Sequence, residues 1–282
     1  IVVLTAYAAD DRNMPLSSRP NSSSAFRIIE AVNLRSLRPD CRVVVSGSDV
    51  AARIMSQQLQ LLGVPAELLS VGTMSDSTAG SAEYVRSRFP SVDCVPARRN
   101  LGFAGGNNLG WEHIRARYPR VRHLCLLNQD TIVTPGWLGP LVGFLEANGD
   151  VAAVQPKVML HPEVHLFNTA GNRSHFLGFG FVTGYREVDR GQYDRAARID
   201  FASGAACVLR AAALERLGLF NEGFFMYLED AELGWRLAQA GLRSMFVPDS
   251  VVYHKYSFRH DYAHYYHLER NRFWLLLLYY KW

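Results

Sequence analysis

Short apolar runs alternate with longer amphipathic stretches through much of the chain. Runs of strand length occur at residues 1–7, 42–45, 92–96, 123–127, 151–155 and 205–209. Helical periodicity is clearest at residues 25–37, 50–62, 78–88, 107–117 and 137–147. Strands that alternate with helices predict an α/β fold with a mostly parallel central sheet and helices on both of its faces.

Two segments depart from this alternation. Residues 10–24 form a polar loop after the first predicted strand, at the carboxyl end of the sheet, where ligands of such folds bind. Residues 161–199 are glycine-rich, irregular and aromatic, and we expect an elaborated loop region there. No internal repeat is visible.

Composition narrows the class of protein. The chain has 282 residues, of which 49% are hydrophobic and 20% are charged, so one large domain, alone or with a short appendage, is expected. A net charge of +4 does not indicate a nucleic-acid partner. The cysteines lie far apart without a CxxC pair, and Cys125 and Cys207 fall inside apolar runs, which predicts buried thiols in a reducing compartment.

The most informative segment is residues 225–236, FMYLEDAELGWR, in which three carboxylates follow an aromatic run. Arg236 stands four residues after Glu232 and can pair with it along a helix. Glu229 and Asp230 have no such local partner. Carboxylates held against apolar surface bind protons more tightly, which suits a general base. A helix start, where the dipole favours acids, is the structural alternative.

A glycine-rich segment, residues 100–110, follows the predicted strand at 92–96 and opens a helix. Glycines at positions 102, 105 and 106 let the backbone approach a ligand, and free N–H groups at a helix start can bind phosphate. The spacing does not match the dinucleotide-binding fingerprint. A glycine-rich turn capped by asparagine is the alternative.

Polar residues also end the strand at residues 123–127. Asn128, Gln129 and Asp130 follow it directly, before a proline-glycine turn. An acid beside other oxygen-bearing side chains can hold a hard divalent cation whose shell is completed by phosphate oxygens. Alternatively, Asp130 caps a turn.

Taken in order, five motifs resemble the family-2 glycosyltransferases of the GT-A fold, and most closely the bacterial rhamnosyltransferase-like branch. They are NLGFAGGNN, LLNQDTIVTPGWL, FASGAACVLR, FFMYLEDAELGWRLAQAG and FVPDSVVYHKYS. The resemblance runs from about residue 100 to the end of the chain. It implies a glycosyltransferase domain over residues 1–256, with a nucleotide-binding half to about 132 and an acceptor-binding half from 133, followed by an amphipathic helix over 257–282.

The resemblance also implies roles for individual residues. Asp230 would be the catalytic base, and Asp130 and His254 would bind a divalent cation, Mn²⁺ or Mg²⁺. The acceptor side would be formed by Ser203, Gly204, Ala205 and Glu229. The nucleotide-sugar donor would be bordered by Thr5, Ala6, Tyr7, Ser46, Asn100, Gly102, Phe103, Gly106, Asn107, Asn128 and Gln129.

The implied activity is inverting transfer of a sugar from a nucleotide-diphosphate donor to a glycan or lipid-linked acceptor, in cell-surface polysaccharide synthesis. Resemblance favours dTDP-rhamnose as donor, and a homodimer is compatible with it. Several positions depart from the family pattern: Asn128 stands where an acid is common, Asn221 and Glu232 replace aspartates, and Ser46 and Gly47 replace an Asp-Asn pair. A non-catalytic sugar-nucleotide-binding or scaffold paralogue is therefore the alternative function.

The C-terminal stretch is apolar from Phe273 to Tyr280, which is shorter than the about 20 residues that span a bilayer. Cationic residues flank it, and Phe273, Trp274, Leu277 and Tyr280 fall near one helical face. This pattern predicts an interfacial helix and a peripheral, cytoplasmic location at the inner face of the cell membrane. A helix docked on the core or in a dimer contact is the alternative.

Overall fold

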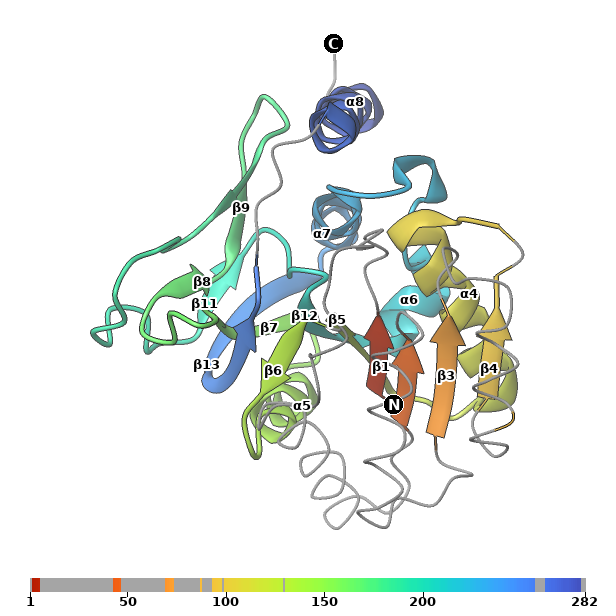
Figure 1. The fold of residues 1–282 in the computed structure, drawn as a ribbon, viewed down its shortest axis with the longest axis horizontal. Coiled ribbons are helices and arrows are strands. Elements are labelled where there is room, and N and C mark those ends of the chain that lie inside the picture. The colour runs from red at the N-terminus through yellow and green to blue at the C-terminus, as the bar shows by residue number, and fades with distance from the viewer. Residues whose placement is uncertain are drawn as a thin grey trace.

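The computed structural model describes residues 2–5, 43–46, 69–73, 87, 93–97, 99–128, 130–256 and 262–279. Within these ranges an 11-stranded sheet forms the centre of the molecule (Figure 1). Its main path runs through β11 (Ala197–Ile199), β13 (Arg243–His254), β7 (Val151–Leu160), β12 (Ala206–Arg210), β5 (His123–Asn128), β1 (Val2–Thr5), β2 (Val43–Ser46), β3 (Leu69–Thr73) and β4 (Asp93–Pro96). Off this path, β6 (Thr131–Val133) pairs with β13, and β8 (Phe167–Thr169) pairs with β7.

The sheet has a parallel half and a mixed half. Strands β5, β1, β2, β3 and β4 are parallel, as the alternation of strands and helices predicts. Strand β12 then runs antiparallel to both β5 and β7, and β13 runs parallel to β7. In the parallel half the carboxyl ends share one edge, where Thr5 lies opposite Asn128.

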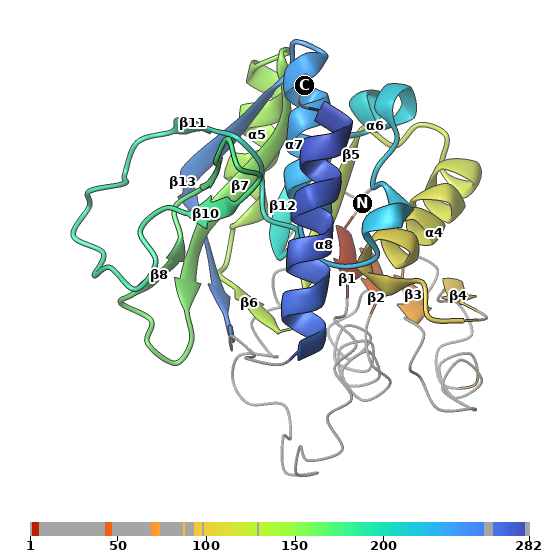
Figure 2. The same ribbon diagram turned by 90° about the horizontal axis from the view of Figure 1, so that it is seen from above.

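Helices cover both faces of the sheet. They are α4 (Gly102–Arg117), α5 (Leu138–Ala147), α6 (Ala211–Leu217), α7 (Glu229–Gln239) and α8 (Tyr262–Tyr279), with a short 3-10 helix η2 (Glu222–Phe224) before α7. Figures 1 and 2 show α5 on the face opposite α7, and α8 outside the layer that contains α7. Among the described residues, no helix is long and apolar enough to cross a membrane.

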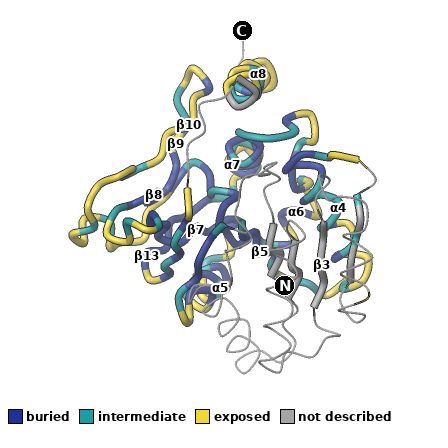
Figure 3. Tube along the Cα trace, in the orientation of Figure 1, coloured by how far each residue is buried: buried dark blue, intermediate teal, exposed yellow. Residues whose placement is uncertain are grey.

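The core lies along the central strands, and Figure 3 shows their burial. Every residue of β7 is buried, and Trp111 and Ile114 of α4 pack into the same cluster of buried residues as Leu124 and Leu126 of β5. Full burial of such a side chain stabilises the fold by roughly 1.5–3 kcal/mol. Cys125 and Cys207 are buried and free, as their apolar surroundings predict.

The predicted elements that fall on described residues are found with two differences, and the sequence pattern missed the strands β3 and β13. Helix α4 begins at Gly102 rather than 107, because the glycine-rich segment itself forms the first turns. Residues 161–199 are not simply a loop, since they contain β8, β11 and a hairpin of β9 (Asn172–Ser174) and β10 (Gly180–Val182). Each of these strands is three residues long, too short for alternation to appear. The helices predicted at 25–37, 50–62 and 78–88 lie outside the described residues, except helical Ser87.

Candidate active site

Three of the sequence motifs meet at the carboxyl edge of the parallel strands. The amide of Asn128, at the end of β5, donates a hydrogen bond to the carbonyl of Ala205 at 2.8 Å. The amide of Gly204, in the same loop, donates to Oδ2 of Asp230 at 3.2 Å. The end of β5, the loop before β12 and the start of α7 are therefore held together by direct hydrogen bonds.

The glycine-rich motif joins this group through Gly102. The carboxamide oxygen of Asn100 accepts from the Gly102 amide at 2.9 Å, and Gly102 adopts a left-handed φ of 66°. A Cβ atom at Gly102 would lie 2.3 Å from the carbonyl oxygen of Phe225, which also accepts from the Ala104 amide at 3.1 Å. The sequence suggested that this glycine makes room for a ligand. The structure shows that Gly102 makes room for Phe225, and approach to a ligand stays a prediction.

The other residues predicted to border the nucleotide-sugar donor differ in burial and in the element that carries them. Phe103 and Asn107 are buried in α4, and a Cβ atom on Gly204 would lie 2.9 Å from the Phe103 ring, so Phe103 supports the loop before β12. Asn100 is exposed, whereas Gly106 and Asn128 are half-buried. Thr5 and Ser46 end β1 and β2. Ala6, Tyr7 and Gln129 lie outside the described residues.

The carboxylates of the acidic motif have separate environments. Burial raises the pKa of Asp230, although the backbone amides of Gly204 and Ala231 donate to its carboxylate and oppose that rise. Burial and the neighbouring Asp230 charge raise the pKa of Glu229 well above its usual value. Oε2 of Glu229 has no hydrogen-bond partner among the residues that the structure describes. These directions agree with the proton affinity predicted from the apolar surroundings.

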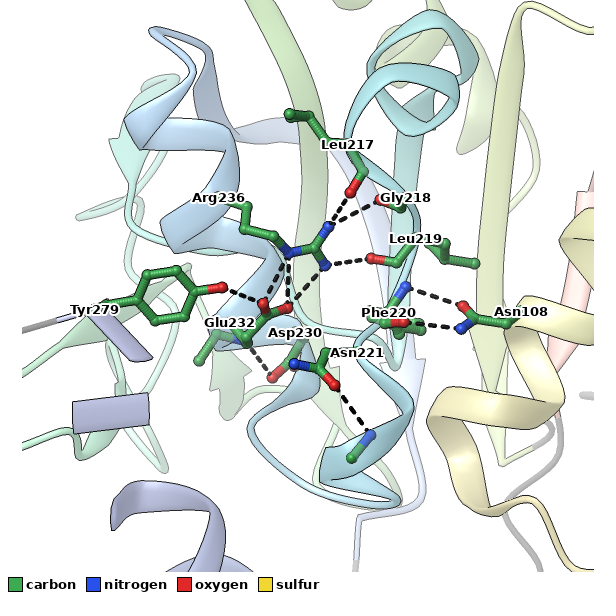
Figure 4. A network of polar contacts seen from close by, with 12 residues as sticks. Asn108, Leu217, Gly218, Leu219, Phe220, Asn221, Asp230, Glu232, Arg236 and Tyr279 are labelled. Atoms are coloured by element: carbon green, nitrogen blue, oxygen red, sulfur yellow. Dashed lines mark hydrogen bonds and ion pairs between the residues drawn. The ribbon is translucent and has the colours of Figure 1, made fainter. Parts of the chain in front are cut away.

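Glu232, by contrast, is paired as predicted. Its carboxylate lies 2.8 Å from the guanidinium of Arg236, one helical turn further along α7, and its side chain is almost completely buried. The same guanidinium donates to carbonyl groups at the end of α6 (Figure 4). Of the three acids, Asp230 is the half-buried one that contacts the loop before β12.

The backbone just before α7 is strained. Phe225, Tyr227 and Leu228 have φ values of 60°, 70° and 62°, although none is glycine. Each left-handed non-glycine residue costs roughly 1–2 kcal/mol. Leu228 is the N-cap of α7, and no side-chain cap hydrogen bond is found there in the described structure. Such strain persists only where surrounding contacts fix the backbone, and it is common at active sites.

Asp130 and His254, predicted to share a cation, lie side by side. Nε2 of His254 is 3.2 Å from Oδ1 of Asp130, and the Lys255 amide donates to the Asp130 carbonyl at 2.8 Å. Nδ1 of His254 is 2.9 Å from Oδ1 of Asn168, an atom that can only accept. Nδ1 therefore carries a proton in this contact, and Nε2 faces Asp130.

This pair suits a divalent cation held by two protein ligands. A histidine that binds metal commonly donates its other ring N–H to an oxygen, as His254 does to Asn168. The described residues contain no group of three or more His, Cys, Asp or Glu side chains that could bind a metal. Within the part of the chain that the structure describes, further ligands would therefore be oxygens of other kinds, such as those of water or a diphosphate.

Buried amides that sequence reasoning missed hold the site in place. Gln155 of β7 is fully buried, and its Oε1 accepts from the Ser203 amide at 2.8 Å and from Asn172 Nδ2 at 2.9 Å. Asn168 orients His254 in the same manner. The available signal was a polar residue inside a mostly apolar strand, as at Gln155 in VAAVQPKVML, where Lys157 is the other.

Comparison with known proteins identifies the family to which the chain belongs. The profile described as "Glycosyltransferase like family 2" matches residues 22–273, so the chain belongs to this family. It is similar to the N-acetylglucosaminyl-diphospho-decaprenol L-rhamnosyltransferases of two Mycobacterium tuberculosis strains, CDC 1551 / Oshkosh and ATCC 25618 / H37Rv, with 27% identity over 197 residues. The match covers 63% of this chain and 63% of each relative.

Solved structures show the same fold at low sequence identity. The mannosyltransferase PcManGT from Pyrobaculum calidifontis, in complex with GDP-Man and Mn²⁺, has a TM-score of 0.53 and 17% identity, covering 92% of this chain and 76% of that one. GalNAc-T7 with UDP, GalNAc and Mn²⁺ has a TM-score of 0.55 and 15% identity, covering 78% of this chain and 43% of that one. The mixed sheet and these neighbours identify the GT-A fold, as the sequence motifs predict.

Proposed function

We propose that this protein transfers a sugar from a nucleotide-diphosphate donor to a hydroxyl group of a glycan or lipid-linked acceptor, with Asp230 as general base. The observation that carries the proposal is the place of Asp230. Its carboxylate accepts a hydrogen bond from the amide of Gly204, at the sheet edge where the family's sequence motifs meet, and burial raises its pKa. A raised pKa makes a carboxylate a stronger base, so it accepts a hydroxyl proton more readily than an exposed aspartate does.

The proposed reaction is a direct displacement. Asp230 takes the proton of the acceptor hydroxyl as the oxygen of that hydroxyl forms a bond to the anomeric carbon. The bond from that carbon to the donor diphosphate breaks, and the electron pair leaves with the diphosphate. Glu229 is buried and Glu232 is bound to Arg236, so neither is placed to serve as a second, nucleophilic carboxylate. One base and one displacement give inversion at the anomeric carbon.

We further propose that Asp130 and His254 hold a divalent cation. Their separation of 3.2 Å and the orientation of His254 by Asn168 support this assignment. The cation, Mn²⁺ or Mg²⁺, would stabilise the negative charge of the departing diphosphate. Two solved structures with the same fold are complexes that contain Mn²⁺ together with UDP or GDP-Man.

The rhamnosyltransferase relatives support rhamnose as the transferred sugar and a lipid-linked acceptor. A protein that meets such an acceptor would work at a membrane surface, at the cytoplasmic face of a bacterial cell. The outer face of α8 suits this location, because Phe273 and Leu277 are 54% and 66% exposed. The β9–β10 hairpin extends this apolar surface. Arg272 of α8 lies 4.5 Å from the ring centre of Phe179 and 4.4 Å from that of Phe273.

The proposal is tested by measuring nucleoside diphosphate release. The protein would be incubated with dTDP-rhamnose, UDP-N-acetylglucosamine or GDP-mannose, with an N-acetylglucosaminyl-diphospho-lipid acceptor, in Mn²⁺, Mg²⁺ or EDTA. We expect one of the donors to release its nucleoside diphosphate, and only when both the acceptor and the cation are present. Donor binding by thermal shift without any release would instead favour the alternative function, a non-catalytic sugar-nucleotide-binding or scaffold paralogue. Equal release in EDTA would remove the cation from the mechanism.

A further inference from the structure

One buried side chain of α8 forms hydrogen bonds to the strained backbone before α7. Asn271 is fully buried, and its Nδ2 donates to the carbonyl oxygens of Phe224, Met226 and Tyr227 at 2.8, 2.7 and 2.7 Å. An amide nitrogen has two hydrogens, so one of them is shared between two carbonyls. These carbonyls belong to the segment that contains the left-handed residues.

Arg270, the preceding residue, binds the same backbone segment. The guanidinium of Arg270 donates to the carbonyls of Gly223 and Phe224, both at 2.8 Å, and to Oδ1 of Asn271 at 2.7 Å. The contact with Oδ1 leaves the Asn271 nitrogen turned toward the backbone. We call Arg270 and Asn271 together the carbonyl clamp.

Contacts on either side tie α8 to the same region. The His267 ring stacks on Phe225, with centroids 5.3 Å apart, and Phe225 lies against Gly102 of the glycine-rich motif. At the other end of α8, the Tyr279 hydroxyl donates to the carboxylate of Glu232 on α7 (Figure 4). Helix α8 is thus docked along one face, whereas the face with Phe273 and Leu277 is exposed.

We propose that Asn271 is a positioning residue for sugar transfer, which acts by fixing the backbone from which Asp230 projects. This inference rests on the proposed function of Asp230. Only Leu228 and Glu229 separate Tyr227 from Asp230, and Leu228 caps α7 without a side-chain hydrogen bond in the described structure. The direction of the first turn of α7 is therefore set by the segment that the carbonyl clamp holds. No residue of the clamp belongs to the pair Asp130 and His254, where the donor diphosphate is proposed to bind.

The test compares Asn271→Ala and Asn271→Asp with the wild-type protein and with a control variant, Leu275→Ala. The Asp variant keeps the shape but presents an oxygen to three carbonyl oxygens. Leu275 is buried one turn further along α8, so its truncation weakens the docking of α8 without removing the clamp. We expect both Asn271 variants to lose roughly 100-fold in kcat, as small misplacements of catalytic groups do, with nucleoside diphosphate affinity within about threefold of wild type. Leu275→Ala should lower the Tm but keep kcat within about threefold.

Two further readouts separate positioning from a general structural role. The acid limb of the kcat profile should move to lower pH in Asn271→Ala, because a carboxylate released into water is more easily ionised. Hydrogen exchange, measured without substrate, should be faster at amides 224–231 in Asn271→Ala than in Leu275→Ala. If the Asn271 variants do not fold, Arg270→Lys provides the same measurements with half of the clamp weakened.

Three results would overturn the inference. They are an unchanged kcat in the Asn271 variants, a loss of kcat in Leu275→Ala equal to theirs, or unchanged hydrogen exchange at amides 224–231 in Asn271→Ala. The exchange measurement does not depend on turnover. A wild-type protein that transfers no sugar would therefore refute the proposed function, while the exchange data would still decide whether Asn271 fixes this backbone.

Discussion

Replacing Gly102 by alanine should damage the fold at the point where the glycine-rich and acidic motifs touch. The new Cβ would lie 2.3 Å from the carbonyl oxygen of Phe225 and 2.6 Å from its ring. Gly102 also has a φ of 66°, which an alanine adopts only at a cost. The same helix offers a matched control in Gly110, where an added Cβ would meet nothing within 4 Å.

The magnitude follows from three terms. The left-handed conformation costs an alanine roughly 1–2 kcal/mol, and forcing a methyl group into a packed site costs roughly 1–3 kcal/mol. The lower entropy of the unfolded alanine variant offsets about 0.4–1 kcal/mol of this. The expected loss is therefore about 1–5 kcal/mol, or about 2–10 °C in Tm for a chain of this size. Gly110→Ala should instead gain about 0.5–1 kcal/mol, since alanine is favoured inside helices.

Thermal and denaturant unfolding of the two variants provide the assay, with nucleoside diphosphate affinity measured in parallel. We expect Gly102→Ala to lose stability and Gly110→Ala to gain it. If Gly102→Ala kept wild-type stability but bound the nucleotide poorly, the glycine would serve ligand approach, and the packing explanation would be wrong.

Three further predictions concern the cation pair, the buried acid and the exposed apolar surface. Asp130→Ala should weaken nucleoside diphosphate binding in Mn²⁺ but not in EDTA, and His254→Ala should do the same more mildly; equal losses in both media would make these residues structural. The pKa of Glu229 is raised in the folded protein, so the folded state binds this proton more tightly than the unfolded chain does. The resulting contribution to the free energy of unfolding is complete below the unfolded pKa of Glu229 and is lost as pH rises through its folded pKa. Glu229→Gln should therefore raise the Tm relative to wild type at pH 8 but not at pH 4, and an equal difference at both would contradict the buried, unpaired acid. Serine at Phe181 and Phe273 should reduce sedimentation with anionic liposomes at low salt, whereas serine at exposed Val164, outside the hairpin and α8, should not; wild-type protein that ignores such liposomes would refute membrane contact.

Four of the five strands in the parallel half, and the family to which the motifs belong, could be predicted from the sequence, whereas β3 was missed. Apolar runs and helical periodicity are local signals, and they located β5, β7 and β12 to within a few residues at their starts. The pairing of Glu232 with Arg236 was predictable for the same reason, because both residues lie on one helix. Likewise, the raised proton affinity expected of an acid beside apolar residues is found for Asp230, whose own burial raises its pKa.

What the sequence could not reveal depends on contacts between distant residues. Gly102 meets Phe225 and Asn271 meets Tyr227 only after the chain has folded, and no local pattern marks either pair. The C-terminal helix illustrates the same limit. Periodicity identified its apolar face, yet the buried Asn271 that docks α8 on the acidic segment looked like one more polar residue between two arginines.

The most direct test of the proposed mechanism is the transfer rate of Asp230→Asn, measured beside its nucleoside diphosphate affinity. The amide keeps the shape of the side chain but cannot take up the acceptor proton, and loss of a general base typically costs about two to four orders of magnitude in rate. Asp249→Asn, at an exposed position of β13, controls for the loss of one negative charge. We predict that Asp230→Asn loses at least about 100-fold in kcat, with donor affinity near that of wild type. A rate within about tenfold of wild type would contradict the assignment of Asp230 as the base.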